Sequence, residues 1–435
     1  MSVEEIRNRI HWALTFGNKI PMVRKIVEIQ RDLLLRSIEL CVEIYDPSPP
    51  RRAALEPDLK AYRVELDHYE VIGDDFLRAP RGSMKAITIE NEHIVRSSLG
   101  FSYQPWAEPR LRTLRERYSL DAVIGPGASE FEQMVRLRNW GRSQWKRSDW
   151  QPRLPDFDIL AILERDHRNT DGRENDKSVN YTPCSFFPPQ YIQLLLALGH
   201  QARYVSISHE SVEFHGMTEV WSNQHRKWIT MDADLNLYYQ KDGLPLNLLE
   251  VHNLRYLDDP LGFEMVREPQ DSGDDEWKKP LADKDFFLSY HTYFRTELRN
   301  DWLTNRYFRG HPGRSEQATL YFHDPRLEPP RPWSRISPVT SRVQDFYWTL
   351  NQVEIHTRRH QFQCAADCLA LLFRTVTPNF SSFEITLDEN TSTSSSSPLF
   401  DWKLHQGENS LTVRSINQAG LRGIPSRIVI NYQDT

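Results

Sequence analysis

A thiol, an imidazole and a carboxylate follow one another along the chain at Cys184, His215 and Asp232. These are the parts of a cysteine-nucleophile site, in which a thiolate attacks, the imidazole takes up a proton and the carboxylate orients the imidazole. In a chain of 435 residues the three residue types alone carry little weight. The predicted strands and helix that must position these three residues carry more weight. A second carboxylate, Asp234, is an alternative to Asp232.

Two predicted strands, 212–221 and 227–234, would bring the imidazole to the carboxylates. The period of two gives each strand one face, with His215 on the first face and both Asp232 and Asp234 on the second. A short polar turn joins the two strands, so they are expected to pair antiparallel. With these faces turned inward, the pair predicts a contact between the histidine and a carboxylate.

A strongly apolar helix is predicted just after the thiol. Pro188 and Pro189 fall in what should be its first turns, and proline is tolerated only at the very start of a helix. The regular helix is therefore predicted to begin near Phe187, with Cys184 on a loop before it. In that position the dipole of the helix stabilises a Cys184 thiolate less strongly. Pro183, directly before the thiol, adds to this effect.

Four segments around these residues, taken together, resemble the transglutaminase-like superfamily of bacterial type. The resemblance covers about residues 105–250 and implies that Cys184 is the nucleophile, His215 the base and Asp232 the orienting acid. This sequence departs from the family where Pro183 replaces a glycine and Ala233 replaces a proline. The segments are Leu198-Gly199-His200-Gln201-Ala202-Arg203-Tyr204-Val205, His215-Gly216-Met217-Thr218-Glu219-Val220, Lys227 to Asp232, and the lead-in from Tyr118 to Trp140.

The fold class expected is α+β, with a papain-like or transglutaminase-like core between a helical extension and an all-β sandwich. Short strands at regular spacing near the C-terminus, with Trp402 and Leu411 in their core, predict the sandwich, which resembles immunoglobulin-like domains. The predicted domains are a helical or mixed extension over 1–100, the transglutaminase-like domain over 105–255, an aromatic- and proline-rich connector over 256–340, and the sandwich over 341–435.

Composition excludes some classes of function. The net charge is −6 and the basic residues are scattered, which argues against a nucleic-acid partner. No apolar run is long enough to span a bilayer, so no membrane partner is expected. A signal peptide is not visible, which makes the cytoplasm the default, although a secreted chain whose leader had been removed would look the same. Four cysteines do not indicate a disulfide framework.

No cofactor and no metal site is predicted. His356, His360, Cys364 and Cys368 recur every four residues and are zinc-ligand types, but four ligands in line on one helix cannot surround a tetrahedral ion. The segment also has the pattern of a strand.

The sequence also predicts an ion pair. Arg203 is the expected partner of the glutamate in the strand that contains His215.

The function predicted is a thiol-dependent hydrolase of amide bonds, acting on a peptide, protein or glycopeptide through an acyl-thioenzyme. An amine in place of water would make the same chemistry a transferase. The alternative is a glycan-directed or non-catalytic binding module. An aromatic-rich segment, 286–308, could bind carbohydrate, although packing between domains is the simpler explanation.

Overall fold

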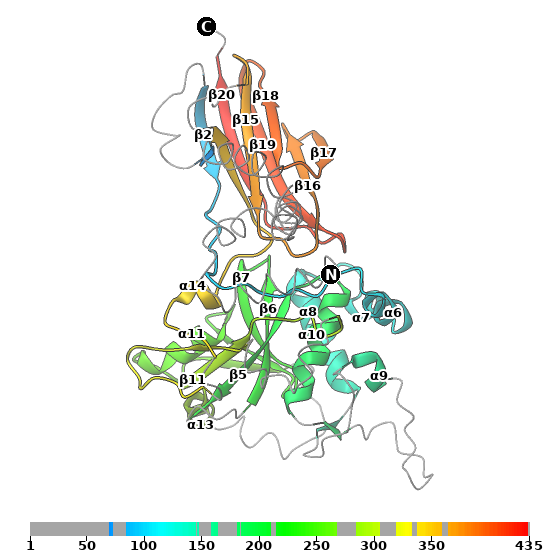
Figure 1. The fold of residues 1–435 in the computed structure, drawn as a ribbon, viewed down its shortest axis with the longest axis vertical. Helices are drawn as coiled ribbons and strands as arrows, with labels where there is room; N and C mark the ends of the chain where they lie inside the picture. Colours follow the sequence, from blue (N-terminus) through cyan, green and yellow to red (C-terminus); the bar gives the residue numbers. More distant parts are fainter. Residues whose placement is uncertain are drawn as a thin grey trace, which may run out of the picture. The chain divides into compact units, whose positions relative to one another are not determined.

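The structure is a computed structural model that describes residues 69–72, 84–144, 146–147, 158–163, 181–182, 184–209, 215–267, 284–304, 319–332, 337–358 and 364–433. The helices expected near the N-terminus, together with Pro183 and His360, lie outside these residues. The chain forms two compact units. One combines the described residues up to Arg96 with those from Trp348 onward, and the other runs from Ser97 to Tyr347 (Figure 1).

The Ser97–Tyr347 unit is built on a nine-stranded sheet in the order β10-β8-β7-β6-β5-β11-β12-β13, with β9 paired to β8. All of its pairs are antiparallel except β12 with β13. The strands are β5 (Ala202–Ser208), β6 (His215–Ser222), β7 (Lys227–Asp232), β8 (Leu237–Lys241), β9 (Leu244–Pro245), β10 (Glu264–Arg267), β11 (Tyr293–Glu297), β12 (Thr319–Phe322) and β13 (Val339–Thr340).

Helices cover both faces of this sheet. The alternation along β5 sends Ala202 and Tyr204 into one core and Val205 and Ile207 into the other. The first core is closed by α6 (Pro109–Arg117), α7 (Leu120–Ile124), α8 (Glu130–Ser143), α9 (Ile159–Leu163) and α10 (Phe187–Ala197), and the second by α11 (Leu248–Asn253), α13 (Lys284–Tyr290) and α14 (Val343–Phe346). Short 3-10 turns η1 (Cys184–Phe186) and η2 (Leu254–Tyr256) and the short pair β3 (Lys146–Arg147) and β4 (Tyr181–Thr182) complete the unit.

This mixture of helix and sheet agrees with the α+β class expected from the sequence. Helix α8 begins with a capping box, in which the Ser129 hydroxyl accepts from the Glu132 backbone N–H and the Glu132 carboxylate accepts from the Ser129 backbone N–H. Among the described helices, none is both long enough and apolar enough to cross a membrane.

The expectation that residues 256–340 form a connector is wrong, because this segment contributes strands to the sheet. They supply β10 to β13, so half of the sheet order lies in the segment expected to be irregular. Three of its aromatic side chains, Phe287, Phe294 and Phe322, are buried in the second core. The strands are short and separated by long proline-rich stretches, which hides the period of two that identifies a strand.

The other unit is a sandwich of two antiparallel sheets around one core. One sheet has the order β1-β14-β15-β18 and the second β17-β16-β19-β20-β2. Trp402 and Leu411 are buried in the shared core, as predicted. The strands are β1 (Tyr69–Val71), β2 (Met84–Glu90), β14 (Val353–Arg358), β15 (Cys368–Thr375), β16 (Phe380–Leu387), β17 (Thr391–Ser395), β18 (Leu399–Lys403), β19 (Gly407–Asn417) and β20 (Ser426–Tyr432).

The boundary expected at residue 341 is corrected by the two N-terminal strands. β2 pairs antiparallel with β20, and β1 pairs with β14, so both belong to the sandwich rather than to a separate extension. Met84 and Ala86 of β2 lie in the sandwich core. Nothing in the sequence of β2 names its distant partner, because an alternating strand pattern identifies a strand and not the strand it pairs with.

Truncation should show that the N-terminal strands and the C-terminal segment fold as one unit. Removing residues 341–435 alone takes away β20 and leaves β2 as an unpaired strand with apolar residues uncovered, so this variant is expected to aggregate. Removing 1–96 together with 348–435 should leave a soluble unit that unfolds cooperatively, which size-exclusion chromatography and near-ultraviolet circular dichroism would measure. Equal solubility of the two variants would contradict the pairing.

Candidate functional site

The hairpin of β6 and β7 positions the imidazole and both carboxylates. The two strands pair antiparallel with Trp221 opposite Trp228, which confirms the predicted pair and its inward faces. His215 begins β6, Asp232 ends β7, and Asp234 lies in the turn that follows. Both carboxylates border the imidazole, Asp232 through a hydrogen bond and Asp234 within 4.8 Å.

The imidazole bonds to one of the two carboxylates. Nε2 of His215 lies 2.7 Å from Oδ2 of Asp232, and both side chains are buried, with exposures of 6% and 0%. Because an ionised carboxylate can only accept, Nε2 carries the proton of this bond. The other oxygen, Oδ1, accepts from the backbone N–H of Leu235 at 2.8 Å, which fixes the carboxylate in place. Nδ1 remains the nitrogen that is open to a further partner.

Cys184 begins the 3-10 turn η1, and the regular helix α10 follows from Phe187. The helix thus begins where the prolines predicted, because Pro188 and Pro189 occupy its first turn, in which backbone N–H groups have no partner within the helix. As a residue, Cys184 is partly exposed.

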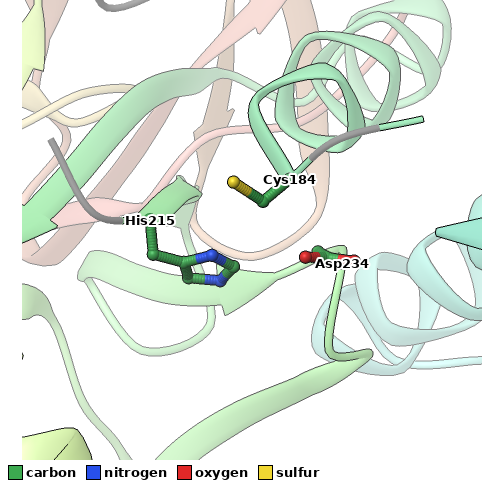
Figure 2. Close-up of side chains that lie close together, drawn as sticks. All are labelled: Cys184, His215 and Asp234. Atoms are coloured by element: carbon green, nitrogen blue, oxygen red, sulfur yellow. The ribbon is translucent and has the colours of Figure 1, made fainter. Parts of the chain in front are cut away.

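The thiol, the imidazole and the second carboxylate converge. Ligand atoms of Cys184, His215 and Asp234 all lie within 4.8 Å of one another. Figure 2 shows them approaching from three elements, the turn before α10, the start of β6 and the turn after β7. The sequence-predicted residues Cys184, His215 and Asp232 thus come together around one ring. Asp234 lies close to both the thiol and the imidazole.

The surroundings of His215 favour its protonated form. Burial is the largest single influence and lowers the pKa of the imidazole. The charge and hydrogen bond of Asp232, together with the interaction with Cys184, outweigh it and hold the pKa of His215 well above the usual 6.5. The direction of this shift favours the imidazolium form, which is the proton donor that acyl transfer to a cysteine requires.

Two buried arginines on α8 hold the turn after β7, and neither was predicted. Arg142 donates from Nε to the backbone oxygen of Asp234 at 2.7 Å, and its guanidinium lies 5.2 Å from the ring centre of Phe187 at the start of α10. Arg138 donates from Nε to Oδ1 of Asn236 at 3.0 Å. Helix α8 thus fixes the carboxylate turn and contacts the helix that follows the thiol.

The sequence does contain a signal for these arginines. They follow Met134 at successive spacings of four, so Met134, Arg138 and Arg142 share the buried face of α8. Arginine on an apolar face requires a buried acceptor, which is what the turn supplies.

A second histidine near the site was also missed, because it lies in the supposed connector. His291 is buried, its Nδ1 is 2.8 Å from the carbonyl oxygen of Phe287, and its ring packs edge-on against Tyr239. Burial is the main cause that lowers the pKa of His291 to about 4, and the charge of His215 contributes. His291 is therefore neutral at neutral pH and does not repel the imidazolium.

The described members of the histidine and cysteine series near residue 360 do not lie on one helix. His356 lies in β14, and Cys364 and Cys368 form a disulfide at the start of β15. This disulfide was not predicted from the sequence. Asp401 lies next to the two sulfurs, which are not thiolate ligands while they are bonded to each other.

No family model matches the chain, and no curated protein sequence matches it.

Proposed function

We propose that this chain is a thiol-dependent hydrolase of amide bonds on a papain-like or transglutaminase-like core. The observation that carries the proposal is the buried imidazole of His215. One of its nitrogens donates to Asp232, and the ring lies within reach of the thiol of Cys184. A thiol, a base and an orienting acid in this relation are what nucleophilic acyl transfer requires.

The first half of the reaction forms a thioester. The Cys184 thiolate attacks the carbonyl carbon of the amide, and the carbonyl electrons move to the oxygen. When the tetrahedral intermediate collapses, the carbon–nitrogen bond breaks and the His215 imidazolium gives its proton to the leaving amine. Asp232 holds the ring so that Nδ1 carries this proton. The products of this half are a free amine and an acyl-enzyme.

The second half releases the acyl group. The neutral imidazole of His215 takes a proton from water, and the hydroxide adds to the thioester carbon. Collapse breaks the carbon–sulfur bond, which leaves a carboxylic acid and restores the thiolate beside an imidazolium. An amine that reached the thioester first would give a new amide instead. Peptides, proteins and glycopeptides all offer the amide that this chemistry needs.

A glycan-directed or non-catalytic binding module is the competing proposal. It was suggested by the aromatic-rich segment, which could have lined a sugar groove. The described aromatic residues there favour packing instead, since Phe287 and Phe294 are buried in the core. A non-catalytic binding module would not need a partly exposed cysteine beside a histidine whose pKa is raised. The enzyme is therefore the preferred proposal.

The rate at which Cys184 is alkylated tests the proposal without a known substrate. An activated pair should react rapidly at about pH 6–7, because the raised pKa of His215 keeps the imidazolium that stabilises a thiolate. In His215→Ala this fast reaction should disappear, and the rate should rise only near pH 8.5, as it does for an ordinary thiol. Mass spectrometry of the Cys184 peptide would give the rate at this one cysteine.

The control compares another histidine of the same unit. His200 is buried, and burial lowers its pKa to about 4. His200→Gln should leave the alkylation profile of Cys184 in place. A parent profile that already resembles an ordinary thiol, and that His215→Ala does not change, would refute the activated pair and favour the binding module.

A further inference from the structure

The second carboxylate of the hairpin has no task in the hydrolysis described above. Asp232 bonds to Nε2 of the imidazole, whereas a carboxylate oxygen of Asp234 lies within 4.8 Å of the ligand atoms of Cys184 and His215. Asp234 is buried, with an exposure of 2%. A negative charge beside a thiolate does not help the thiolate to form. The position of Asp234 therefore suits the binding of a cation better than a role in catalysis.

We propose that Cys184, His215 and Asp234 bind a zinc ion that reversibly blocks the thiol. The proposal rests on the same thiol and imidazole as the proposed enzyme, and it adds a regulator to that site. A bound zinc ion would occupy the sulfur lone pair that attacks the substrate. Removing the ion would restore the nucleophile.

The three donors are those that zinc prefers. A thiolate sulfur, an imidazole nitrogen and a carboxylate oxygen together select zinc over calcium or magnesium, which take oxygen ligands. Bonds of about 2.3 Å to sulfur and 2.0–2.2 Å to nitrogen or oxygen set the donors roughly 3.3–3.7 Å apart around a tetrahedral ion. The donors already lie within 4.8 Å of one another, so modest side-chain rotations are enough.

The neighbours of the donors have the form that metal sites need. A histidine that binds zinc usually donates its other N–H to a carboxylate, which fixes the ring and raises its basicity. His215 does this through Nε2 to Asp232, so Nδ1 is the nitrogen that faces the ion. Arg142 holds the backbone of Asp234 at 2.7 Å. Three protein donors with a fourth position open to water complete the coordination.

Charge and protons are accounted for on binding. The thiolate of Cys184 and the carboxylate of Asp234 balance the two charges of zinc, and Asp232 adds a further negative charge behind the ring. Arg142 opposes the ion, and its guanidinium donates from Nε to the backbone oxygen of Asp234. The proton on Nδ1 must leave before the nitrogen can bind. Zinc affinity should therefore rise with pH.

Protection of Cys184 from alkylation measures the binding directly. The full chain carrying Cys364→Ser and Cys368→Ser is used, so that reduction of this disulfide cannot create a second group of zinc donors with Asp401. Zinc chloride is expected to slow alkylation of Cys184, and a chelator should restore it. Magnesium and calcium chloride should give no protection. Failure of zinc to protect this cysteine would overturn the proposal.

A matched pair of variants then tests the role of each carboxylate, Asp232 as the support of the ring and Asp234 as a donor to the ion. Asp232→Asn changes only the support of the ring and should weaken zinc protection by about 10- to 100-fold. Asp234→Asn removes a donor and should weaken it by at least as much. In chelator, Asp234→Asn should be alkylated faster than the parent, because a negative charge near the thiolate is gone. Unchanged zinc affinity in Asp234→Asn would exclude this carboxylate as a donor.

The two proposals fail in different ways. If the alkylation profile in chelator is that of an ordinary thiol but zinc still protects Cys184, the metal site stands and the enzyme does not. If the profile is that of an activated pair but zinc has no effect, the enzyme stands and the metal site does not. Absorption of the cobalt-substituted protein offers a second readout, because a thiolate bound to cobalt gives a charge-transfer band that Cys184→Ser should remove.

Discussion

Asp232→Asn is expected to lower turnover by up to about four orders of magnitude, the size of the loss when the orienting aspartate of a Ser-His-Asp enzyme is replaced by asparagine. The reason is the 2.7 Å bond from Nε2 of His215 to Oδ2 of Asp232. An amide in this position keeps the shape of the carboxylate but not its charge, so it no longer stabilises the imidazolium or selects its tautomer. Release of aminocoumarin from a panel of peptidyl amides would measure the loss.

An exposed aspartate in the same unit provides the control. Asp242 lies in the turn between β8 and β9 with φ of 53°, a conformation that asparagine adopts readily. Asp242→Asn should therefore retain the turnover of the parent. If Asp232→Asn retained it as well, the carboxylate would not be orienting the base, and the catalytic assignment would have to be withdrawn.

The second large effect concerns stability and a buried ion pair. Arg203 and Glu219 face each other across β5 and β6 with both side chains fully buried, and Nη2 lies 2.5 Å from Oε2. This confirms the partner predicted from the sequence. The guanidinium also lies 4.4 Å from the ring centre of Trp228. The other oxygen of Glu219 accepts from the Leu248 backbone and from the Tyr347 hydroxyl.

Arg203→Met alone is expected to lower the free energy of unfolding by about 3–5 kcal/mol, because it leaves the Glu219 carboxylate buried without its cation. Urea unfolding followed by tryptophan fluorescence would measure the loss. The double variant Arg203→Met, Glu219→Leu should recover much of it, since neither charge is then left alone. A double variant that is as unstable as the sum of the two single variants would show that the pair is not coupled.

The hairpin that carries the site could be predicted because its information is local. The period of two in β6 and β7, and the short turn between them, fix which side chains share a face, and the register follows from the turn. His215, Asp232 and Asp234 were placed together on that basis alone. The choice between the two aspartates was not available, because it depends on how the chain curls after β7, where Leu235 and Arg142 hold the turn.

The parts that could not be predicted depend on partners far away in the chain. The pairing of β2 with β20 and the entry of β11 and β12 into the sheet are set by packing between distant segments. An alternating pattern says that a strand exists and which side it buries, but the same pattern would suit many partners. The acceptors of the two arginines of α8 could not be predicted for the same reason, since they lie 98 and 92 residues later in the chain.

The position of β2 has a consequence for how the protein is made. Its partner β20 begins at residue 426, so the strand ending at residue 90 leaves the ribosome long before the strand that completes its sheet. At about 5–20 residues per second, synthesis of the intervening chain takes roughly 15–70 s. The Ser97–Tyr347 unit lies wholly within that interval and can finish folding first. During this time the β2 edge is open, and a chaperone that binds extended apolar strands would find it there.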